Sequence, residues 1–334
     1  MFSEVHLSMK KKQPLISIVI PLYKVAPQFY EAVYKCLELN YSNYEIIIGI
    51  DKGINLPLRH PKVIFMKTRQ SRTGPGEKRD LAISKAKGEY IAFLDDDSYP
   101  DRNWLKKALL HLQKQKVEVV CGPGLTPPAN GFSQKLTGAI LASYFGSGPF
   151  YFRFIKATPR YVDDYPAYNL IASKRVLRKV GGYGTKFYGG EDTALCLKII
   201  NLGYKIFYHP DITVYHHRRA FPQGYFKQVG NVGLHRGYFV KIYPKTSLRF
   251  VYFLPTLITL FGVILIIYSI FDFGIALLII SSLGLVYYFS VFIESIRKNQ
   301  LHITLLLPPA IFISHIVYGY YFFKGLLMIK NLKR

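Results

Sequence analysis

Short apolar runs alternate with stretches of helical periodicity over the first part of the chain. The runs LISIVIPLYK, YEIIIGID, KVIFMKT, YIAFLDDD and VEVVCGPG predict buried strands, and helical patterns cover residues 28–39, 77–86 and 104–114. Strands that alternate with helices in this way predict an α/β fold with a doubly wound, mostly parallel sheet. Two strands end on aspartate, at Asp51 and at residues 95–97, and the carboxyl ends of strands are where such sheets bind ligands.

The regular alternation stops after the fifth strand. Residues 129–158 are rich in Gly, Phe and Tyr with weak periodicity, which indicates either a segment on the membrane surface or an ordinary substrate loop. Residues 161–183 predict a strand, a helix and a glycine turn, and a further helix is expected from the GGED motif to Leu202. The stretch KIFYHPDITVYHH predicts the next strand. Aromatic and basic residues interleave over 221–243, as expected of an interfacial helix.

Three apolar segments follow. Residues 250–270 and 273–293 contain no charged residue, and each is about long enough to cross the hydrocarbon core as a helix. They predict a membrane hairpin that turns at Asp272. Residues 303–323 are interrupted by two prolines, so this segment is either a kinked span, which we expect, or a re-entrant element.

The chain is strongly basic, with 44 Lys and Arg against 20 Asp and Glu and a net charge of +24. This charge fits a protein that lies against anionic lipids and handles phosphorylated substrates. No nucleic-acid partner is expected, because the basic residues are spread along the chain and are followed by the apolar segments. Residues 1–14 lack the apolar core of a signal peptide, so residues 1–249 are expected on the cytoplasmic side of a cell membrane that the protein crosses several times. The three cysteines have no metal-ligand spacing and are expected to be reduced core thiols.

Three consecutive aspartates end the fourth strand. Carboxylates packed this closely repel one another, which favours a cation between them. Asp95 and Asp97 can point the same way and suit a hard divalent ion that phosphate oxygens also hold. The alternative is a solvated acidic turn before a helix.

Four blocks in chain order carry a family resemblance: SIVIPLYK, IIIGID, EKRDLAISKAKGEYIAFLDDDSYP and GGEDTALCLKI. They resemble the nucleotide-sugar-dependent glycosyltransferases of family 2, which have the GT-A fold, and the resemblance covers residues 15 to about 245. The tail LPPAIFISHIVYGYYFFKG is similar to that of membrane-anchored members that build lipid-linked glycans and exopolysaccharides. The resemblance implies a hexosyltransferase with a nucleotide-diphosphate sugar donor, a lipid-linked or glycan acceptor, and Mg²⁺ or Mn²⁺ as cofactor.

The resemblance also implies roles for the residues that bind the donor. Pro21 and Tyr23 would border the nucleotide base, and Asp51 would hydrogen-bond the base or the ribose. The family's second acid and glycine-serine after this aspartate are replaced by Lys-Gly, which leaves base specificity open. Arg79 would face the nucleotide from its helix, and its alternative is a solvated helix residue.

The acidic motifs would carry the chemistry. Asp95 and Asp97 match the DxD metal motif, with Asp96 between them in the nucleotide-sugar site. Asp192 in GGED matches the catalytic aspartate of inverting members, which takes a proton from the acceptor. Glu191 would support it at a helix N-terminus, and the alternative for both acids is helix capping.

Basic and polar residues follow the next predicted strand. His216 is a candidate third metal ligand or phosphate contact, while Arg218 and Arg219 would hold the diphosphate or face anionic lipid. Gln228 and Arg236 loosely resemble the glutamine and arginine motif of membrane-bound polysaccharide synthases. The tryptophan of that motif is missing, which leaves processive synthesis open.

These features divide the chain into five parts. They are a basic tail at 1–14, a GT-A domain at 15–225, an interfacial amphipathic segment at 226–249, a transmembrane region at 250–328 and a basic tail at 329–334. Three functions stay open: extension of a lipid-linked glycan, transfer of a sugar onto a polyprenyl phosphate, and a non-catalytic membrane scaffold that binds a nucleotide or lipid. We expect extension, because the tail resembles that group more closely. The presence of both acidic motifs argues against the scaffold.

Overall fold

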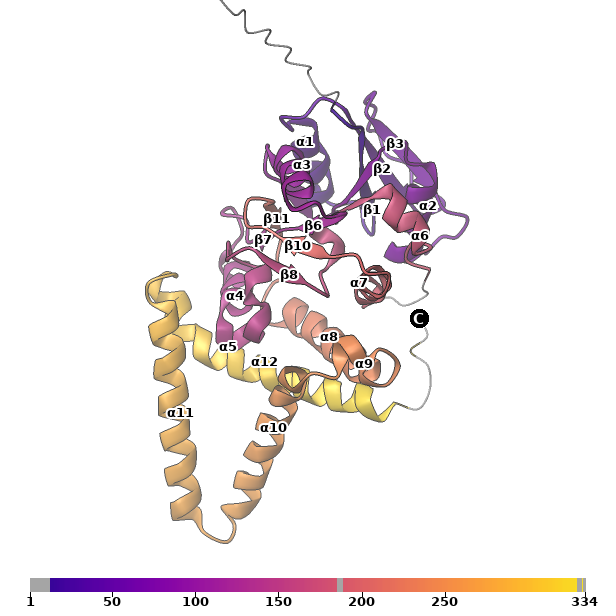
Figure 1. Cartoon of the computed structure of the whole chain (residues 1–334). Coiled ribbons are helices and arrows are strands. Elements are labelled where there is room, and N and C mark those ends of the chain that lie inside the picture. Colours follow the sequence, from indigo (N-terminus) through magenta and orange to yellow (C-terminus); the bar gives the residue numbers. More distant parts are fainter. Residues whose placement is uncertain (1–12, 185–188, 329–331, 333–334) are drawn as a thin grey trace, which may run out of the picture.

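The computed structural model describes residues 13–184, 189–328 and 332 (Figure 1). The basic tails expected at 1–14 and 329–334 lie almost wholly outside the described residues. An α/β domain forms the first part of the chain, and the long C-terminal helices lie together on one side of it (Figure 1).

A mixed eight-stranded sheet forms the centre of the domain. Its strand order is β3-β2-β1-β4-β9-β6-β10-β8. The strands are β1 (Ile16–Pro21), β2 (Tyr44–Ile50), β3 (Val63–Lys67), β4 (Tyr90–Phe93), β6 (Val119–Cys121), β8 (Arg160–Val162), β9 (Leu170–Ser173) and β10 (Ile206–Tyr208). Only β8 and β9 run antiparallel to their neighbours within this sheet. The predicted mostly parallel sheet is therefore confirmed.

The apolar runs of the strands are unbroken because helices cover both faces of the sheet. Ile18 packs into a core with α1 (Pro27–Leu37) and α3 (Trp104–Gln115) on one face. The next residue, Val19, packs into a second core with α2 (Pro75–Lys85), α6 (Lys174–Lys179) and α7 (Glu191–Asn201). Strands buried on both faces read as continuous apolar runs. The three cysteines are buried and unpaired, as expected.

Two stretches that were each predicted to form one strand form two short strands instead, one in each of two sheets. VEVVCGPG forms β6 and then β7 (Gly124–Leu125), while KIFYHPDITVYHH forms β10 and then β11 (Val214–His216). A proline follows the first part of each stretch, and proline cannot donate a ladder hydrogen bond. β11 pairs with β7 and with β5 (Ser98–Pro100) in a small sheet of its own.

The segment 161–183 holds one strand more than expected. After β8 the chain returns as β9, which enters the main sheet antiparallel between β4 and β6, and α6 follows. The weakly periodic stretch 129–158 contains α4 (Phe132–Ala142), α5 (Tyr144–Ser147) and a 3-10 helix, η1 (Gly148–Arg153). Leu136 and Ile140 of α4 pack against the last helix of the chain, so α4 joins the α/β domain to the C-terminal helices through apolar contacts.

Five helices follow in the described part of the chain. They are α8 (Gln223–Ile242), α9 (Pro244–Ser247), α10 (Phe250–Tyr268), α11 (Phe273–Ser295) and α12 (Leu301–Leu327). By length and composition, α10, α11 and α12 could each cross a membrane. α10 and α11 form a V that points away from the domain, and α12 runs across the open end of the V beside α8 (Figure 1).

Glycines bring the backbones of α8 and α12 into close contact. A Cβ atom at Gly237 would lie 2.0 Å from the carbonyl oxygen of Phe322, and one at Gly325 would lie 2.1 Å from that of Leu234. Small residues permit this approach between apolar helices. α12 is one helix through its two internal prolines, and α8 packs along it.

Candidate functional site

A cavity of about 1380 Å³ opens at the carboxyl ends of β1 and β4 and continues to α10 and α11. All of the predicted site residues except Asp51 line it. These are Pro21, Tyr23, Arg79, Asp95, Asp96, Asp97, Glu191, Asp192, His216, Arg218, Arg219, Gln228 and Arg236. Residues that are far apart in the sequence therefore surround one space.

Asp95, Asp97 and His216 form a group that could hold a metal ion. One ligand atom from each lies within 4.8 Å of the others. The pairing of His216 with Ser98 in the small sheet places the histidine beside the aspartates. His216 Nε2 is 3.0 Å from Asp97 Oδ1, and Arg219 is 3.2 Å from Asp97 Oδ2. Carboxylate oxygens suit hard divalent ions such as Mg²⁺ and Mn²⁺.

The electrostatic surroundings keep Asp97 ionised. Burial alone would raise the pKa of Asp97, but the adjacent His216 and Arg219 outweigh it and lower the pKa to about 2. Asp96 points elsewhere: its Oδ2 accepts hydrogen bonds from the backbone N–H groups of Tyr23 at 2.7 Å and Lys24 at 3.2 Å. Burial and then the charge of Asp97 raise the pKa of Asp96 to about 6. Asp96 thus ties the loop after β1 to the metal motif.

Arg79 joins the metal motif to the second acidic motif. Its guanidinium group is buried, with Nη2 2.6 Å from Asp95 Oδ1. Nη1 lies 3.3 Å from Asp192 Oδ1 and 3.4 Å from Glu191 Oε1. The alternative of a solvated helix residue is therefore wrong. The planar fork of arginine can contact several carboxylates at once, which lysine cannot do.

Asp192 is a carboxylate whose pKa is raised well above its ordinary value. It stands in the first turn of α7, and its Oδ2 accepts a hydrogen bond of 3.0 Å from the backbone N–H of Ala167. Burial raises the pKa of Asp192 to about 7 against the opposing effect of Arg79, and the charge of Glu191 also raises it. Glu191 turns toward Arg79 and accepts a hydrogen bond of 2.8 Å from Gly189 N–H. Glu191 therefore holds the backbone at Gly189, just before α7.

Asp51 lies behind the cavity wall and is held by Lys78. The ammonium group of Lys78 is buried 2.9 Å from Asp51 Oδ2, and Thr73 N–H donates to Oδ1 at 2.9 Å. Burial would raise the pKa of Asp51, but Lys78 outweighs it and the pKa is lowered. Lys78 directly precedes Arg79, but nothing in the sequence marked it as a site residue.

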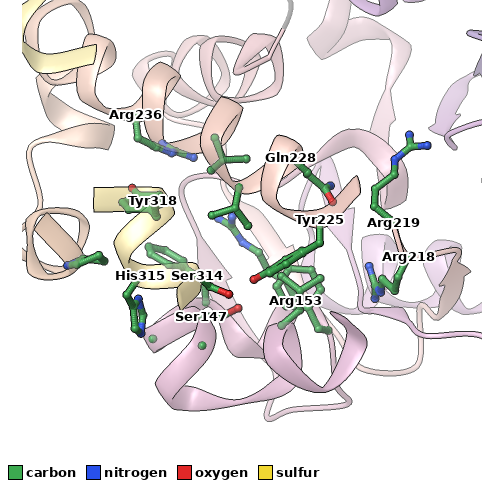
Figure 2. Close-up of a pocket in the computed structure, with 18 of the residues that line it drawn as sticks. Ser147, Arg153, Arg218, Arg219, Tyr225, Gln228, Arg236, Ser314, His315 and Tyr318 are labelled. Carbon is green, nitrogen blue, oxygen red and sulfur yellow. The ribbon is translucent and has the colours of Figure 1, made fainter. Parts of the chain in front are cut away.

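Arg218 and Arg219 lie differently in the cavity (Figure 2). Arg219 is more than half exposed and pairs with Asp97. Arg218 is buried, donates to Thr126 Oγ1 at 3.1 Å and to the carbonyl oxygen of Gly124, and forms no ion pair with a carboxylate of the described residues. Burial lowers its pKa to about 10. A buried, unpaired guanidinium suits an anionic group of a ligand.

A second charged group, which was not predicted from the sequence, surrounds Asp164. The carboxylate of Asp164 contacts Arg236, lies 3.5 Å from Arg153 Nη2, and accepts a hydrogen bond of 3.0 Å from Thr193 Oγ1. Burial would raise the pKa of Asp164, but the two arginines lower it to about 2. Because Thr193 follows Asp192, this group adjoins the candidate base. The Asp-Asp-Tyr-Pro stretch that contains Asp164 matches no motif that would have predicted this charged group.

Comparisons with known proteins agree with this architecture. Residues 17–181 match the family model described as Glycosyl transferase family 2. The chain is 23% identical over 334 residues to the dolichyl N-acetyl-alpha-D-glucosaminyl phosphate 3-beta-D-2,3-diacetamido-2,3-dideoxy-beta-D-glucuronosyltransferase of Methanococcus voltae, covering 93% of this chain and 97% of that protein. It is 31% identical over 109 residues to the UDP-Glc:alpha-D-GlcNAc-diphosphoundecaprenol beta-1,3-glucosyltransferase WfaP of Escherichia coli, covering 31% of this chain and only 43% of that protein.

A solved structure has a similar fold over almost the whole chain. The mannosyltransferase PcManGT from Pyrobaculum calidifontis, in complex with GDP-Man and Mn²⁺, superimposes with a TM-score of 0.56 at 16% identity. The match covers 96% of this chain and 89% of that one. It therefore includes the C-terminal helices as well as the α/β domain.

Proposed function

The chain belongs to glycosyl transferase family 2, and we propose that it is a metal-dependent, inverting enzyme that extends a lipid-linked glycan at a membrane. The predicted GT-A fold and a glycosyltransferase activity with a nucleotide-sugar donor are confirmed. The metal, the inversion and the acceptor are proposals. The names of the Methanococcus and Escherichia relatives, which contain a dolichyl phosphate and a diphosphoundecaprenol, support a lipid-linked acceptor.

The donor diphosphate would lie beside the DxD motif. Asp95, Asp97 and His216 would hold Mg²⁺ or Mn²⁺, and the solved mannosyltransferase with GDP-Man and Mn²⁺ supports this choice. When bound, such an ion neutralises the diphosphate and stabilises the negative charge that grows on it during departure. Arg218 is buried and forms no ion pair with a described carboxylate. It would supply a second positive charge to the diphosphate or to a phosphate of the acceptor.

Asp192 would act on the face of the donor sugar opposite the leaving group. It removes the proton from the acceptor hydroxyl while the oxygen of that hydroxyl bonds to the anomeric carbon of the donor. The bond from this carbon to the diphosphate oxygen breaks, and its electron pair stays on the diphosphate. The observation that carries this proposal is the position of Asp192, beside Arg79 and with a pKa raised to about 7. A general base is most efficient when its pKa is near the working pH.

Transfer onto a polyprenyl phosphate is the alternative. A phosphate acceptor is already anionic and needs little help from a base, whereas a sugar hydroxyl does need it. The placement of the Asp192 carboxylate beside Arg79, next to the metal motif, therefore favours extension of a glycan.

We also propose that α10 and α11 cross the membrane and that α12 lies along its cytoplasmic surface. The crosswise course of α12 beside α8 supports this arrangement (Figure 1). Arg297 and Lys298 after α11, and Lys324 in the last turn of α12, would then all stay on the cytoplasmic side. The third full span expected from the sequence would carry the basic tail to the other side.

Asp192→Asn tests the base directly. The substitution keeps the shape of the side chain but removes the base, so turnover should fall by about 10² to 10⁴ while the donor KM changes only a few fold. The loss should persist at raised acceptor concentration, because the missing function acts in the transition state. Asp211→Asn, at a half-exposed position that does not line the cavity, is the matched control. Nearly intact turnover with weakened donor binding would refute the assignment.

A further inference from the structure

The cavity of the candidate site does not end at the catalytic domain. It continues past α5 and α8 and reaches the space between α10 and α11. One stripe of α10 faces this space with Ile258, Phe261 and Leu265, and one stripe of α11 faces it with Ile280 and Leu283. The two membrane helices thus enclose an apolar extension of the same cavity that contains the acidic motifs.

The space between the two helices is open at mid-height. A Cβ atom built at Gly262 of α10, or at Gly284 of α11, would meet no atom within 4 Å, and both glycines line the cavity. The helices are held instead at their ends. Leu265 and Ala276 are buried near the tip of the V, and at its open end Gly319 of α12 lies close to the backbone of Pro255.

Polar atoms without partners gather where this apolar space meets the catalytic domain. Arg153 Nε, Tyr252 OH and Tyr318 OH are buried and have no hydrogen-bond partner in the structure. The guanidinium group of Arg236 lies 4.9 Å from the ring centroid of Tyr252. We call Arg153, Arg236, Tyr252 and Tyr318 the neck of the cavity, and Figure 2 shows three of them around it.

The neck has a net positive charge and adjoins the candidate base. It holds two arginines against one aspartate, Asp164, and Arg236 also donates to Thr193 Oγ1 at 3.2 Å, one residue beyond Asp192. Buried polar groups are normally satisfied, and unsatisfied ones call for a ligand or another explanation. Two guanidinium groups and two hydroxyl groups suit a phosphate.

We propose that the lipid-linked acceptor enters sideways from the membrane between α10 and α11 and binds with its phosphate at the neck. Its hydrocarbon chain lies along the apolar stripes beside Gly262 and Gly284, while its glycan extends past Arg236 toward Asp192. The occupant is an isoprenoid or other long-chain lipid phosphate, because a continuous path leads from an apolar slot through a cationic neck to the reacting groups. This inference rests on the proposed function, and it adds the route and the binding position of the acceptor.

Filling the slot tests the route. Gly262→Phe and Gly284→Phe place a ring in open space between the helices, so the fold should be retained. With a long-chain lipid-linked acceptor, kcat/KM should fall about tenfold or more, because the ring occupies the place of buried lipid carbons. With an acceptor carrying the same glycan on a short chain, kcat/KM should stay within about twofold of the wild-type value, as should hydrolysis of the donor.

Gly274→Phe is the matched control, because Gly274 lies at the start of α11 and does not line the cavity. Equal losses with long-chain and short-chain acceptors, or an equal effect of Gly274→Phe, would overturn the route. The class of acceptor is tested separately, by assaying the wild-type enzyme with lipid-linked glycans of both chain lengths. If it hydrolyses the donor but extends no lipid-linked glycan of either chain length, the proposed function fails before the route is tested.

Tyr318→Phe tests the phosphate position. A buried hydroxyl without a partner costs stability, so its removal should leave the melting temperature unchanged or raise it. The KM for the lipid-linked acceptor should nevertheless rise about tenfold, because a hydrogen bond to a charged group is lost. A lower melting temperature with an unchanged KM would show that the hydroxyl has a structural role only.

Discussion

Arg79→Gln should move the pH dependence of the enzyme to higher pH. Arg79 is the positive charge next to Asp192, at 3.3 Å, and it opposes the effects of burial and of Glu191 on the pKa of this residue. Glutamine has no charge, so the pKa of Asp192 should rise further in the variant. Asp192 acts as a base only when ionised, so the rate rises with pH through its pKa. Turnover of the variant should therefore be low at neutral pH and recover in alkaline solution.

The size of the effect follows from the contact. An opposite charge at this range lowers a carboxyl pKa by about one to three pH units, so its loss should raise the Asp192 value from about 7 to about 8–10. At pH 7 the ionised fraction then falls from about a half to between about a tenth and a thousandth, which reduces turnover about 5-fold to 500-fold.

The assay measures initial rates from pH 6 to pH 10 at saturating donor and divalent ion. Arg79→Lys is the control, because it keeps the charge but cannot bridge three carboxylates. It should lose turnover while its pH midpoint stays near that of the wild-type enzyme. A melting curve of each variant checks that the fold is retained. If Arg79→Gln has the wild-type midpoint, Arg79 does not control the titration of the base, and the assignment of that titration to Asp192 is wrong.

Two further predictions concern the metal and the membrane. Asp97→Ala should abolish transfer and weaken binding of the nucleotide diphosphate, measured by calorimetry with Mn²⁺, and unchanged turnover in a chelator would refute the metal's role. An impermeant thiol reagent applied to intact cells should label a cysteine placed at Phe271, on the tip of the hairpin, but neither one placed at Asn299 nor one placed at Met328. Labelling of the Met328 position would instead support a third span.

The sequence was sufficient for the doubly wound part of the fold because that part depends on local patterns. Each of the first strands is a continuous apolar run, and helical patterns follow β1, β3 and β4 along the chain. β9 could not be found in this way. It enters the sheet between β4 and β6, so its four residues are buried by strands from elsewhere in the chain rather than by its neighbours in sequence.

The acidic residues of the site were predictable because they belong to short motifs at strand and helix ends. Their partners were not. Lys78 and Asp164 owe their positions to contacts 27 and 72 residues away in sequence, with Asp51 and Arg236 respectively. Such pairs depend on the tertiary fold. A single charged residue in a basic chain does not indicate which residue it will pair with. The same holds for the bridging role of Arg79, whose carboxylate partners come from two different motifs.

Hydropathy alone could not decide the course of α12, since it does not distinguish apolar residues that face lipid from those that face protein. The mean hydropathy of its apolar window is 1.6, against 2.5 for α10 and 2.2 for α11. In α12, 39% of that window is buried inside the structure, against 17% and 11% for the other two helices. Much of the apolar surface of α12 is therefore covered by α4, α8 and α10 rather than left for lipid. A helix covered in this way can be apolar enough to span a membrane and still serve as the platform on which the catalytic domain meets the hairpin.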